Sequence, residues 1–163
     1  MVEIAVSLGS NINREHNICA SAREIRRRHP GCVFSPVFSS AAVGFEGPPF
    51  LNLVAVFESD AKIEGVISEL RQIEDQLGRQ RVEDQMTSRT IDLDLLLYGD
   101  LVFYDQGIDV PRSEILEYAH VLKPLSLVMP DACHPVTGQR YADLWAAMSI
   151  DKDGLLEEEV LEI

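Results

Sequence analysis

The sequence predicts a single α+β domain built on an antiparallel sheet. Short apolar segments rich in Val, Ile and Phe alternate with longer segments whose apolar residues recur at helical spacing. Gly, Pro and Asn separate these segments from one another. At 163 residues the chain is long enough to bury a sizeable core without disulfides or a structural metal.

Four segments have the length and composition of β-strands, because they are rich in β-branched or aliphatic residues and bounded by turn-forming residues. The predicted strands are 3–8, 33–40, 51–59 and the apolar segment RTIDLDLLLYGD at 89–100, which ends in the turn Gly99-Asp100. Pro36 lies inside the second strand and predicts an edge strand or a bulge. Residues 41–50 hold two glycines and two prolines and are predicted to form a loop.

Four segments are predicted to be helical from the spacing of their apolar residues. They are 14–28, 61–77, 113–129 and 141–148. Asn13 is the predicted cap of the first helix, and His29-Pro30-Gly31 ends it. Gly78 stops the second helix, and the third is expected to be interrupted or to end near Pro124.

The resulting order is β-α-β-β-α-β, the ferredoxin-like arrangement of an antiparallel sheet with helices on one face, followed by added C-terminal helices. We expect residues 1–148 to form one domain and 149–163 to form an acidic tail. The last thirteen residues hold six acids and one lysine. The tail is predicted to be a solvated appendage or a short amphipathic helix. Its apolar residues Leu155, Leu156, Val160 and Leu161 could dock on the body.

The formal net charge of −13 argues against nonspecific binding to nucleic acids or anionic membranes. The chain has no apolar run near the roughly 20 residues that span a bilayer, and its start lacks the pattern of a signal peptide. A cytoplasmic location is therefore predicted. Neither the three cysteines nor the four histidines show the spacing of a zinc site, and the cysteines are expected to be small buried hydrophobes.

Asp92 and Asp94 are the most informative residues, because they interrupt a strand that is otherwise apolar. Side chains alternate along a strand, so Ile91, Leu93, Leu95 and Leu97 are predicted to share one face, and Asp92, Asp94 and Leu96 the other. Each buried carboxylate needs a hydrogen bond, a cation or water, and the two like charges repel one another. Magnesium suits them because it takes one or two carboxylates and fills its remaining positions with water and phosphate. An ion pair with Arg89 or another arginine is the alternative.

Arg79, Arg81 and Arg89 lie in the short polar stretch before that strand. Arginine suits bidentate phosphate contacts, so the cluster indicates a polyphosphate and its metal. Surface salt bridges with nearby acids such as Glu83 and Asp84 are the alternative reading. No P-loop or GxGxxG motif occurs. Gly9-Ser10-Asn11 follows the first strand either as a phosphate loop or as a tight strand-to-helix turn.

Five motifs together are similar to those of one enzyme family: SLGSN at 7–11, PFLN at 49–52, GRQR at 78–81, RTIDLDLLLYGD at 89–100 and PDACHPVTG at 130–138. In this order and spacing they resemble 6-hydroxymethyl-7,8-dihydropterin pyrophosphokinases, over roughly residues 2–148. The pattern R-T-hydrophobic-D-L-D is highly specific to that family. The resemblance implies a ferredoxin-like fold, two magnesium ions, and transfer of pyrophosphate from ATP to the pterin hydroxymethyl group in folate biosynthesis.

Carried over by position, the resemblance implies that Asp92 and Asp94 bind both magnesium ions and that Arg79 and Arg89 assist the transfer. The nucleotide site implied in this way comprises Glu74, Arg79, Arg81, Arg89, Leu95 and Arg112. The implied pterin site comprises Ser40, Ala41, Val43, Phe50, Asn52, Asp92 and His120, in which Asn52 hydrogen-bonds the pterin and Phe50 stacks on it. Phe50 is equally well explained as an ordinary core aromatic. The implied partners are small molecules, and a monomer is favoured.

The chain departs from the family pattern at four places. Met86-Thr87-Ser88 stands where the family has Trp-Gly-Pro, Arg112 where it has histidine, Tyr118 where it has arginine, and His120 where an aromatic ring stacks on the pterin. Arg112 is expected to replace a phosphate contact, whereas Tyr118 cannot supply the missing charge. A divergent but working pyrophosphokinase is the favoured interpretation. A noncatalytic pterin-binding or regulatory relative, or a pyrophosphokinase for a modified pterin, are the alternatives.

Overall fold

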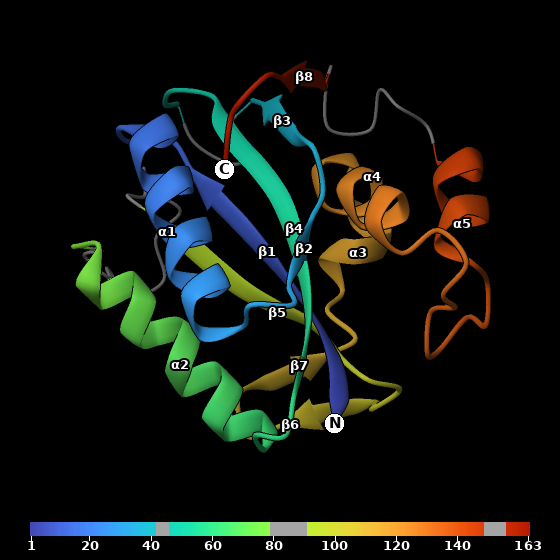
Figure 1. Ribbon diagram of the computed structural model, residues 1–163. Coiled ribbons are helices and arrows are strands. Elements are labelled where there is room, and N and C mark those ends of the chain that lie inside the picture. Colours follow the sequence, from blue (N-terminus) through green and yellow to red (C-terminus); the bar gives the residue numbers. More distant parts are fainter. Residues whose placement is uncertain (42–45, 79–90, 149–155) are drawn as a thin grey trace.

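The computed structural model describes residues 1–41, 46–78, 91–148 and 156–163. The strands are β1 (Val2–Ser10), β2 (Val33–Phe34), β3 (Val37–Ser40), β4 (Phe50–Ser59), β5 (Asp92–Tyr98), β6 (Phe103–Asp105), β7 (Ile108–Val110) and β8 (Glu157–Glu159). The helices are α1 (Arg14–Arg28), α2 (Ile63–Gln76), α3 (Glu114–Glu117), α4 (Ala119–Val128) and α5 (Tyr141–Ala147) (Figure 1).

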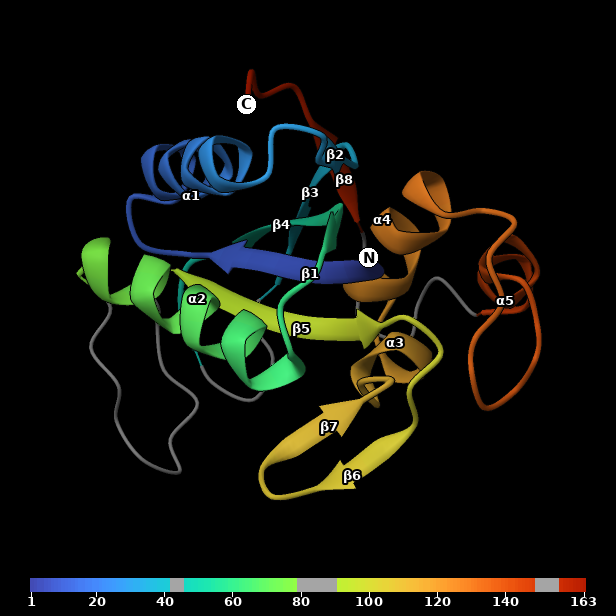
Figure 2. The ribbon, with the colours of Figure 1, turned by 60° about the horizontal axis from the view of Figure 1, so that its bottom comes forward.

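The main sheet has the strand order β5-β1-β4-β3-β8, and β2 pairs with β4 beside β3. Every pairing in it is antiparallel. When β2 and β3 are counted as one interrupted strand, the order is fourth, first, third, second. This order confirms the predicted ferredoxin-like core. Figure 2 shows β1 lying between β4 and β5 at the centre of the sheet.

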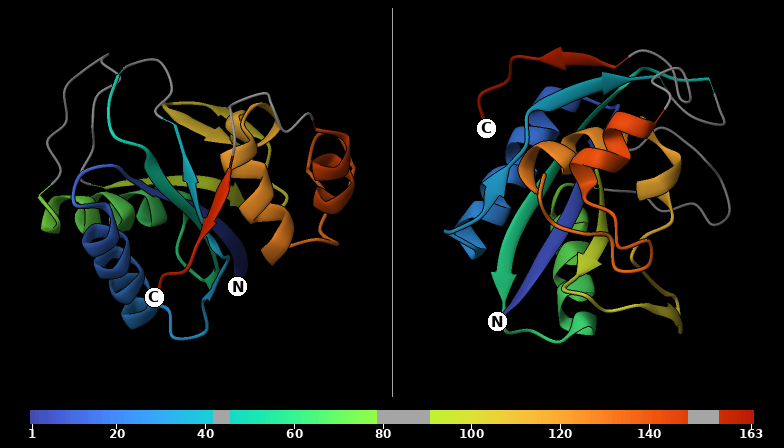
Figure 3. Two further views of the ribbon diagram at one scale, coloured as in Figure 1. Left: turned by 90° about the horizontal axis from the view of Figure 1, so that it is seen from above. Right: turned by 90° about the vertical axis from the view of Figure 1, so that its right-hand side faces the viewer.

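Helices cover both faces of the sheet (Figure 3). On one face α1 and α2 bury a large apolar cluster that includes Ile4, Val6 and Leu8 of β1. On the other face α3, α4 and α5 enclose a second cluster around Ala5. Burying each large aliphatic side chain contributes about 1.5–3 kcal/mol, so the two clusters fix the central strand from both sides.

A β-bulge in β5 changes the predicted face of Leu97. Val6 of β1 pairs with Leu95 and Ala5 pairs with Leu97, so Leu96 is an extra residue. Leu93 and Leu95 pack toward α1 and α2 as predicted. Leu97 was predicted on that face and instead joins Leu96 in the opposite cluster, because the extra residue shifts the alternation by one.

The predicted strand 33–40 is divided at Ser35-Pro36, which confirms that Pro36 marks an interruption. Ser35 keeps the sheet together at this point. Its N–H donates to Val54 O at 2.8 Å, and its hydroxyl accepts from Val54 N at 2.9 Å. The backbone groups that the interruption would leave unpaired are therefore satisfied.

Asn13 stands before α1 but does not cap it with its side chain. Its φ of 43° and ψ of 47° place it in the left-handed region, and its side chain makes no cap hydrogen bond. A side-chain cap needs an extended backbone at this residue, so the prediction of a cap was wrong in its mechanism. Asparagine tolerates the left-handed conformation, which suits it to the turn between β1 and α1.

The predicted helix 113–129 is interrupted at Tyr118 rather than near Pro124. Tyr118 is extended, with φ −119° and ψ 128°, and separates α3 from α4. Its carbonyl accepts from Val121 N at 3.1 Å and Leu122 N at 3.0 Å, which starts the second helix. Pro124 lies inside α4, where the helix continues without its N–H.

The tail residues 156–163 form neither a helix nor a solvated appendage. β8 pairs with β3, with Phe38 opposite Glu158. Leu161 and Ile163 pack partly on the apolar cluster beneath α1 and α2, so the predicted docking of Leu161 is confirmed. Arg26 of α1 donates to Ile163 O at 3.1 Å. Acidic residues are poor strand formers, so packing and edge pairing, rather than local preference, determine this structure.

The hairpin of β6 and β7 was not predicted from the sequence. Gln106 and Gly107 both have positive φ at its two-residue turn, which is the type I′ geometry.

No helix within the described residues has the length and apolarity that crossing a membrane requires.

We expect His134 to make stability depend on pH. Burial lowers the pKa of this imidazole below 6.5, and its Nδ1 accepts from Val136 N at 3.1 Å and Thr137 N at 3.2 Å. The unfolded chain therefore binds a proton more readily than the folded chain, so the free energy of unfolding should fall as the pH drops below about 6.5. His134→Asn keeps an acceptor without titrating. Urea unfolding between pH 7.5 and 5 should give a flatter profile for this variant, and parallel profiles would contradict the assignment.

Candidate active site

The predicted site residues of β4 and β5 lie on either side of Gly9. In the register of the sheet, Gly9 of β1 pairs with Asn52 of β4 and with Asp92 of β5. Paired residues point to the same face, and neighbouring strands are about 4.8 Å apart, so Asn52 and Asp92 project together about 10 Å apart. A β-carbon at Gly9 would lie 3.6 Å from Asn52 Oδ1 and 3.7 Å from Phe50 Cδ1. The absence of a side chain leaves room between the amide and the carboxylate.

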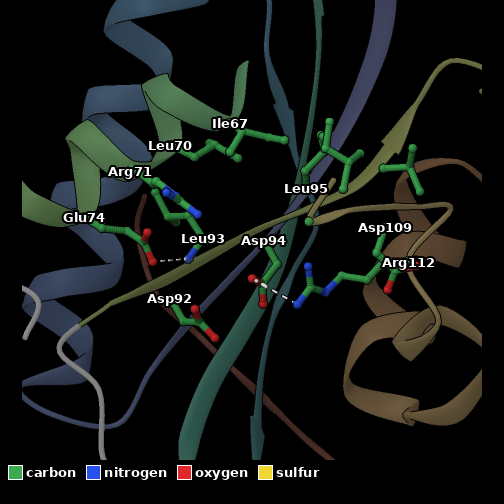
Figure 4. Close-up of a pocket in the computed structure, with 13 residues that line it drawn as sticks. Ile67, Leu70, Arg71, Glu74, Asp92, Leu93, Asp94, Leu95, Asp109 and Arg112 are labelled. Carbon is green, nitrogen blue, oxygen red and sulfur yellow. Dashed lines mark hydrogen bonds and ion pairs between the residues drawn. The ribbon is translucent and has the colours of Figure 1, made fainter. Parts of the chain in front are cut away.

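Asp92 and Asp94 line a pocket of about 330 Å³ at the β5 edge of the sheet (Figure 4). One wall comes from α2, and the opposite wall comes from β7 and Arg112. The residues that line it are Ile67, Leu70, Arg71, Glu74, Asp92, Leu93, Asp94, Leu95, Gly107, Ile108, Asp109, Val110 and Arg112. Of the predicted site residues, Glu74, Asp92, Asp94, Leu95 and Arg112 therefore meet in one cavity.

Arg112 forms an ion pair with Asp94, with Nη2 3.5 Å from Oδ1. Its Nε lies 3.0 Å from Glu114 Oε2, although this contact lacks the angle of a hydrogen bond. Burial acts to lower the pKa of Arg112, but the carboxylates of Asp94, Glu114 and Asp92 outweigh burial and raise it. The guanidinium is therefore a permanent positive charge beside the acid pair.

Glu74 holds the open edge of β5. Its side chain is only 3% exposed, and its Oε2 accepts from the backbone N–H of Leu93 at 3.1 Å. A charged acceptor forms a stronger bond to a backbone N–H than a neutral one. Glu74 thus lines the pocket with other residues of the predicted nucleotide site. It also accepts a hydrogen bond from the strand that carries the acids.

Asn52 is oriented by its neighbours in the sheet. Its Nδ2 donates to Ser40 Oγ at 2.7 Å and lies 3.3 Å from Phe38 O and 3.4 Å from Phe50 O. These contacts hold the amide nitrogen on the side of β3, so that Oδ1 lies toward Gly9. Ser40, Phe50 and Asn52 are therefore brought together as predicted, but none of them lines the pocket of the acid pair.

The segment before Phe50 is fastened by the turn that follows β1. Asn11 donates through Nδ2 to Pro48 O at 3.1 Å, and Arg14 donates through Nη1 to Pro49 O at 3.2 Å. Asn11 is buried, which fits a structural attachment. Gly9 and Ser10 are the last residues of β1, so the strand-to-helix turn begins at Asn11. Asn11 and Arg14 of α1 hold the 46–49 segment.

Comparison with known proteins decides the family. Residues 5–130 match the model of the 7,8-dihydro-6-hydroxymethylpterin-pyrophosphokinase family. The chain belongs to this pyrophosphokinase family. It is 31% identical over 153 residues to the Pseudomonas aeruginosa 2-amino-4-hydroxy-6-hydroxymethyldihydropteridine pyrophosphokinase, covering 88% of this chain and 90% of that enzyme. The Haemophilus influenzae enzyme of the same name is 27% identical over 140 residues, with 83% and 86% covered.

Two longer proteins also match this chain. It is 32% identical over 153 residues to the folic acid synthesis protein fol1 of Pneumocystis carinii, covering 92% of this chain but 20% of that protein. A Plasmodium falciparum HPPK-DHPS crystal structure aligns with a TM-score of 0.67 at 12% identity, over 90% of this chain and 43% of that one. This structural likeness confirms the fold. The chain spans less than half the length of these two proteins.

Two positions at which the chain departs from the pyrophosphokinase pattern lie together. The rings of Tyr118 and His120 are stacked, with centroids 5.1 Å apart and planes at 20°. Both side chains are partly exposed at the start of α4. Val43, Arg79, Arg81, Met86 and Arg89 lie outside the described residues, so their predicted roles stay predictions. Ala41 is described and exposed.

Several residues near the site were not predicted from the sequence. Arg71 and Asp109 line the pocket that contains Asp92 and Asp94. Lys123 lies over the Phe38 ring, with Nζ 4.8 Å from its centroid, and Phe38 is opposite Asn52. Arg71 precedes Glu74 by three residues in α2, and this spacing places both side chains on one face of the helix. This spacing was the available signal, whereas the hairpin that carries Asp109 was not recognised.

We expect Glu74→Met to destabilise the fold through Leu93. The substitution leaves the buried N–H of Leu93 without its acceptor, so the free energy of unfolding should fall by about 1–3 kcal/mol. Glu74→Gln retains an acceptor oxygen and should lose less. Urea unfolding of the three proteins tests this expectation, and a Glu74→Met variant as stable as the parent would contradict the structural role.

Proposed function

We propose that this chain transfers the β,γ-diphosphate of ATP to the hydroxymethyl group of 6-hydroxymethyl-7,8-dihydropterin, releasing AMP. The observation that carries this proposal is the placement of Asp92 between two features. On one side lies the pocket that contains Asp94 and Arg112, and on the other lies the Gly9 gap, with Asn52 across it. A phosphate chain and an acceptor molecule can meet at this carboxylate.

The donor set fits magnesium. Asp92 and Asp94 are separated by one residue, lie on the same face and are partly exposed, so an ion can reach their carboxylates. Within the described residues, no group of three or more His, Cys, Asp or Glu side chains forms a metal centre. Two carboxylates are what magnesium typically takes from a protein in a phosphate site. When bound, the two ions would neutralise charge on the phosphates and polarise the β-phosphorus.

The nucleotide is assigned to the pocket on the β5 edge. Leu93 directs its N–H outward to Glu74, and the alternation of the strand turns the backbone of Leu95 to the same edge, where a base can pair with it. Arg112 lies in this pocket and can contact a phosphate. By the family motif, Arg79, Arg81 and Arg89 add further phosphate contacts.

The pterin is assigned to the gap beside Gly9. Asn52 Oδ1 faces this gap and would accept from a pterin N–H, while the Phe50 ring beside it would stack on the pterin. By the resemblance, His120 supplies a second ring. Ser40 holds the Asn52 amide in this orientation. By the resemblance, Ala41 and Val43 complete the same side of the pocket, and Asp92 contacts the pterin as well.

In the proposed step the hydroxymethyl oxygen attacks the β-phosphorus while the bond from that phosphorus to the α,β-bridging oxygen breaks. The diphosphate is retained on the pterin, AMP leaves, and the hydroxyl proton is released. The arginines stabilise the charge that develops on the phosphate oxygens. Asn52 and the stacked rings align the acceptor, which lowers the entropic barrier to attack.

We expect Asp92→Asn and Asp94→Asn to abolish most AMP release. Each substitution removes a charge that the phosphates and their metal require, at an expected cost of about 10²–10³ in rate. AMP should be measured with ATP, Mg²⁺ and the dihydropterin, and with each omitted in turn. Asp100→Asn removes an exposed charge just beyond β5 and serves as the control. Undiminished release by either site variant, with an unchanged circular dichroism spectrum, would refute the proposal.

We expect Gly9→Ala to weaken pterin binding without unfolding the protein. The added methyl group would meet its neighbours at ordinary contact distances of 3.6–3.9 Å, so the sheet should tolerate it. It would, however, enter the proposed pterin site and weaken binding about tenfold. Gly31→Ala is the matched control, because a β-carbon there meets nothing within 4 Å. Calorimetric affinities that are equal for both variants would place the pterin elsewhere.

A noncatalytic pterin-binding relative is the second candidate, favoured by the ion pair between Arg112 and Asp94 and by Tyr118 in place of a family arginine. A folded protein that binds pterin and releases no AMP would support it. Turnover of only a modified pterin would support the third interpretation instead. A cytoplasmic location, a monomeric state and a lack of nucleic-acid binding remain predictions.

A further inference from the structure

Arg112 is fixed in place from three directions. Its backbone N–H donates to Leu96 O at 2.9 Å, which ties it to the bulge of β5. Its guanidinium lies between Asp94, 3.5 Å from Nη2, and Glu114, 3.0 Å from Nε. The two carboxylates belong to different elements, because Asp94 is in β5 and Glu114 begins α3. The positive charge is therefore placed beside the acid pair by the fold itself.

A cation in this position must compete with a metal ion. Opposite charges this close attract each other, and a second cation on the same carboxylate is repelled by the first. The guanidinium cannot relieve this repulsion by losing its proton, because an arginine side chain stays protonated in proteins. A metal that binds Asp94 must therefore displace Arg112 or tolerate its charge.

We propose that Arg112 is an internal counterion of the acid pair, which holds Asp94 before metal binds and transfers to a nucleotide phosphate when the metal and ATP enter together. The guanidinium keeps its contact with Glu114, and so stays at the pocket wall, while its ion pair with Asp94 breaks. The exchange couples the two ligands, because the phosphate supplies a new partner for the displaced charge. This inference rests on the proposed function, in which Asp92 and Asp94 bind the metal.

The exchange predicts effects of opposite sign from one substitution. Arg112→Gln removes the competing cation, so it should tighten binding of Mn²⁺, used alone as the probe, by about fivefold. The same variant lacks a phosphate contact, so it should bind the nonhydrolysable α,β-methylene-ATP with Mg²⁺ several-fold more weakly. A residue with only a structural role would weaken both. Glu114→Gln frees Arg112 for Asp94 and should weaken Mn²⁺ binding about twofold.

The experiment compares four variants with the parent, with Mn²⁺ affinity measured by electron paramagnetic resonance and analogue affinity by calorimetry. Arg71→Gln removes an equal charge from the same pocket and is the control for long-range electrostatics. If Arg112→Gln binds Mn²⁺ no more tightly than the parent or than Arg71→Gln, the counterion role is refuted. If Arg112→Gln fails to fold, unchanged or tighter Mn²⁺ binding by Glu114→Gln refutes it.

The fourth variant separates this inference from the proposed function. The double variant Asp92→Asn, Asp94→Asn should lose Mn²⁺ binding. If it binds Mn²⁺ as the parent does, the metal site itself is wrong and the proposed function fails with it. If it loses Mn²⁺ while Arg112→Gln matches the parent, only the counterion exchange is overturned.

Discussion

The pairing of β1 with both β4 and β5 is the constraint on which the site depends. β1 is bonded along both edges and packed by helices on both faces. On the face opposite α1 and α2, β1 carries only small residues toward its end, where Ser7 and Gly9 are partly exposed. Large side chains there would fill the space between the neighbouring strands. The centre of the sheet therefore supplies the gap, and its neighbours supply the chemical groups.

The acids of the site are partly compensated by groups of the protein itself. Glu74 is satisfied in part by a backbone N–H, and Asp94 by a guanidinium. Burying a carboxylate without such partners would cost several kcal/mol, so a fold that carries these acids on a core strand needs them. The cost of holding the acids together thus explains why the pocket contains arginine as well as acid. It also explains why ligand binding has to rearrange existing pairs.

The sequence was sufficient to predict most of the fold, including the strand that carries Asp92 and Asp94. Apolar composition and turn residues predicted the strands of the ferredoxin-like core and the first two helices, but not β6, β7 and β8. The alternation within β5 placed Asp92 and Asp94 on one face. Leu97 could not be placed, because a bulge depends on the register with β1 rather than on the local sequence. The break at Tyr118 and the pairing of the tail with β3 could not be predicted either, since both depend on tertiary packing.

Within the site, the contacts that sequence reasoning missed share a physical property. Asn11 and Arg14 act through contacts with carbonyls of Pro48 and Pro49, about 35 residues away in the chain. Such contacts carry no local pattern, because any polar side chain of suitable length can make them. The acids, by contrast, violate the apolar pattern of their own strand, and a violation of this kind is visible without coordinates. Polar residues that interrupt an apolar pattern can therefore be found from the sequence. Residues that act through contacts distant in the chain can be found only once the fold is known.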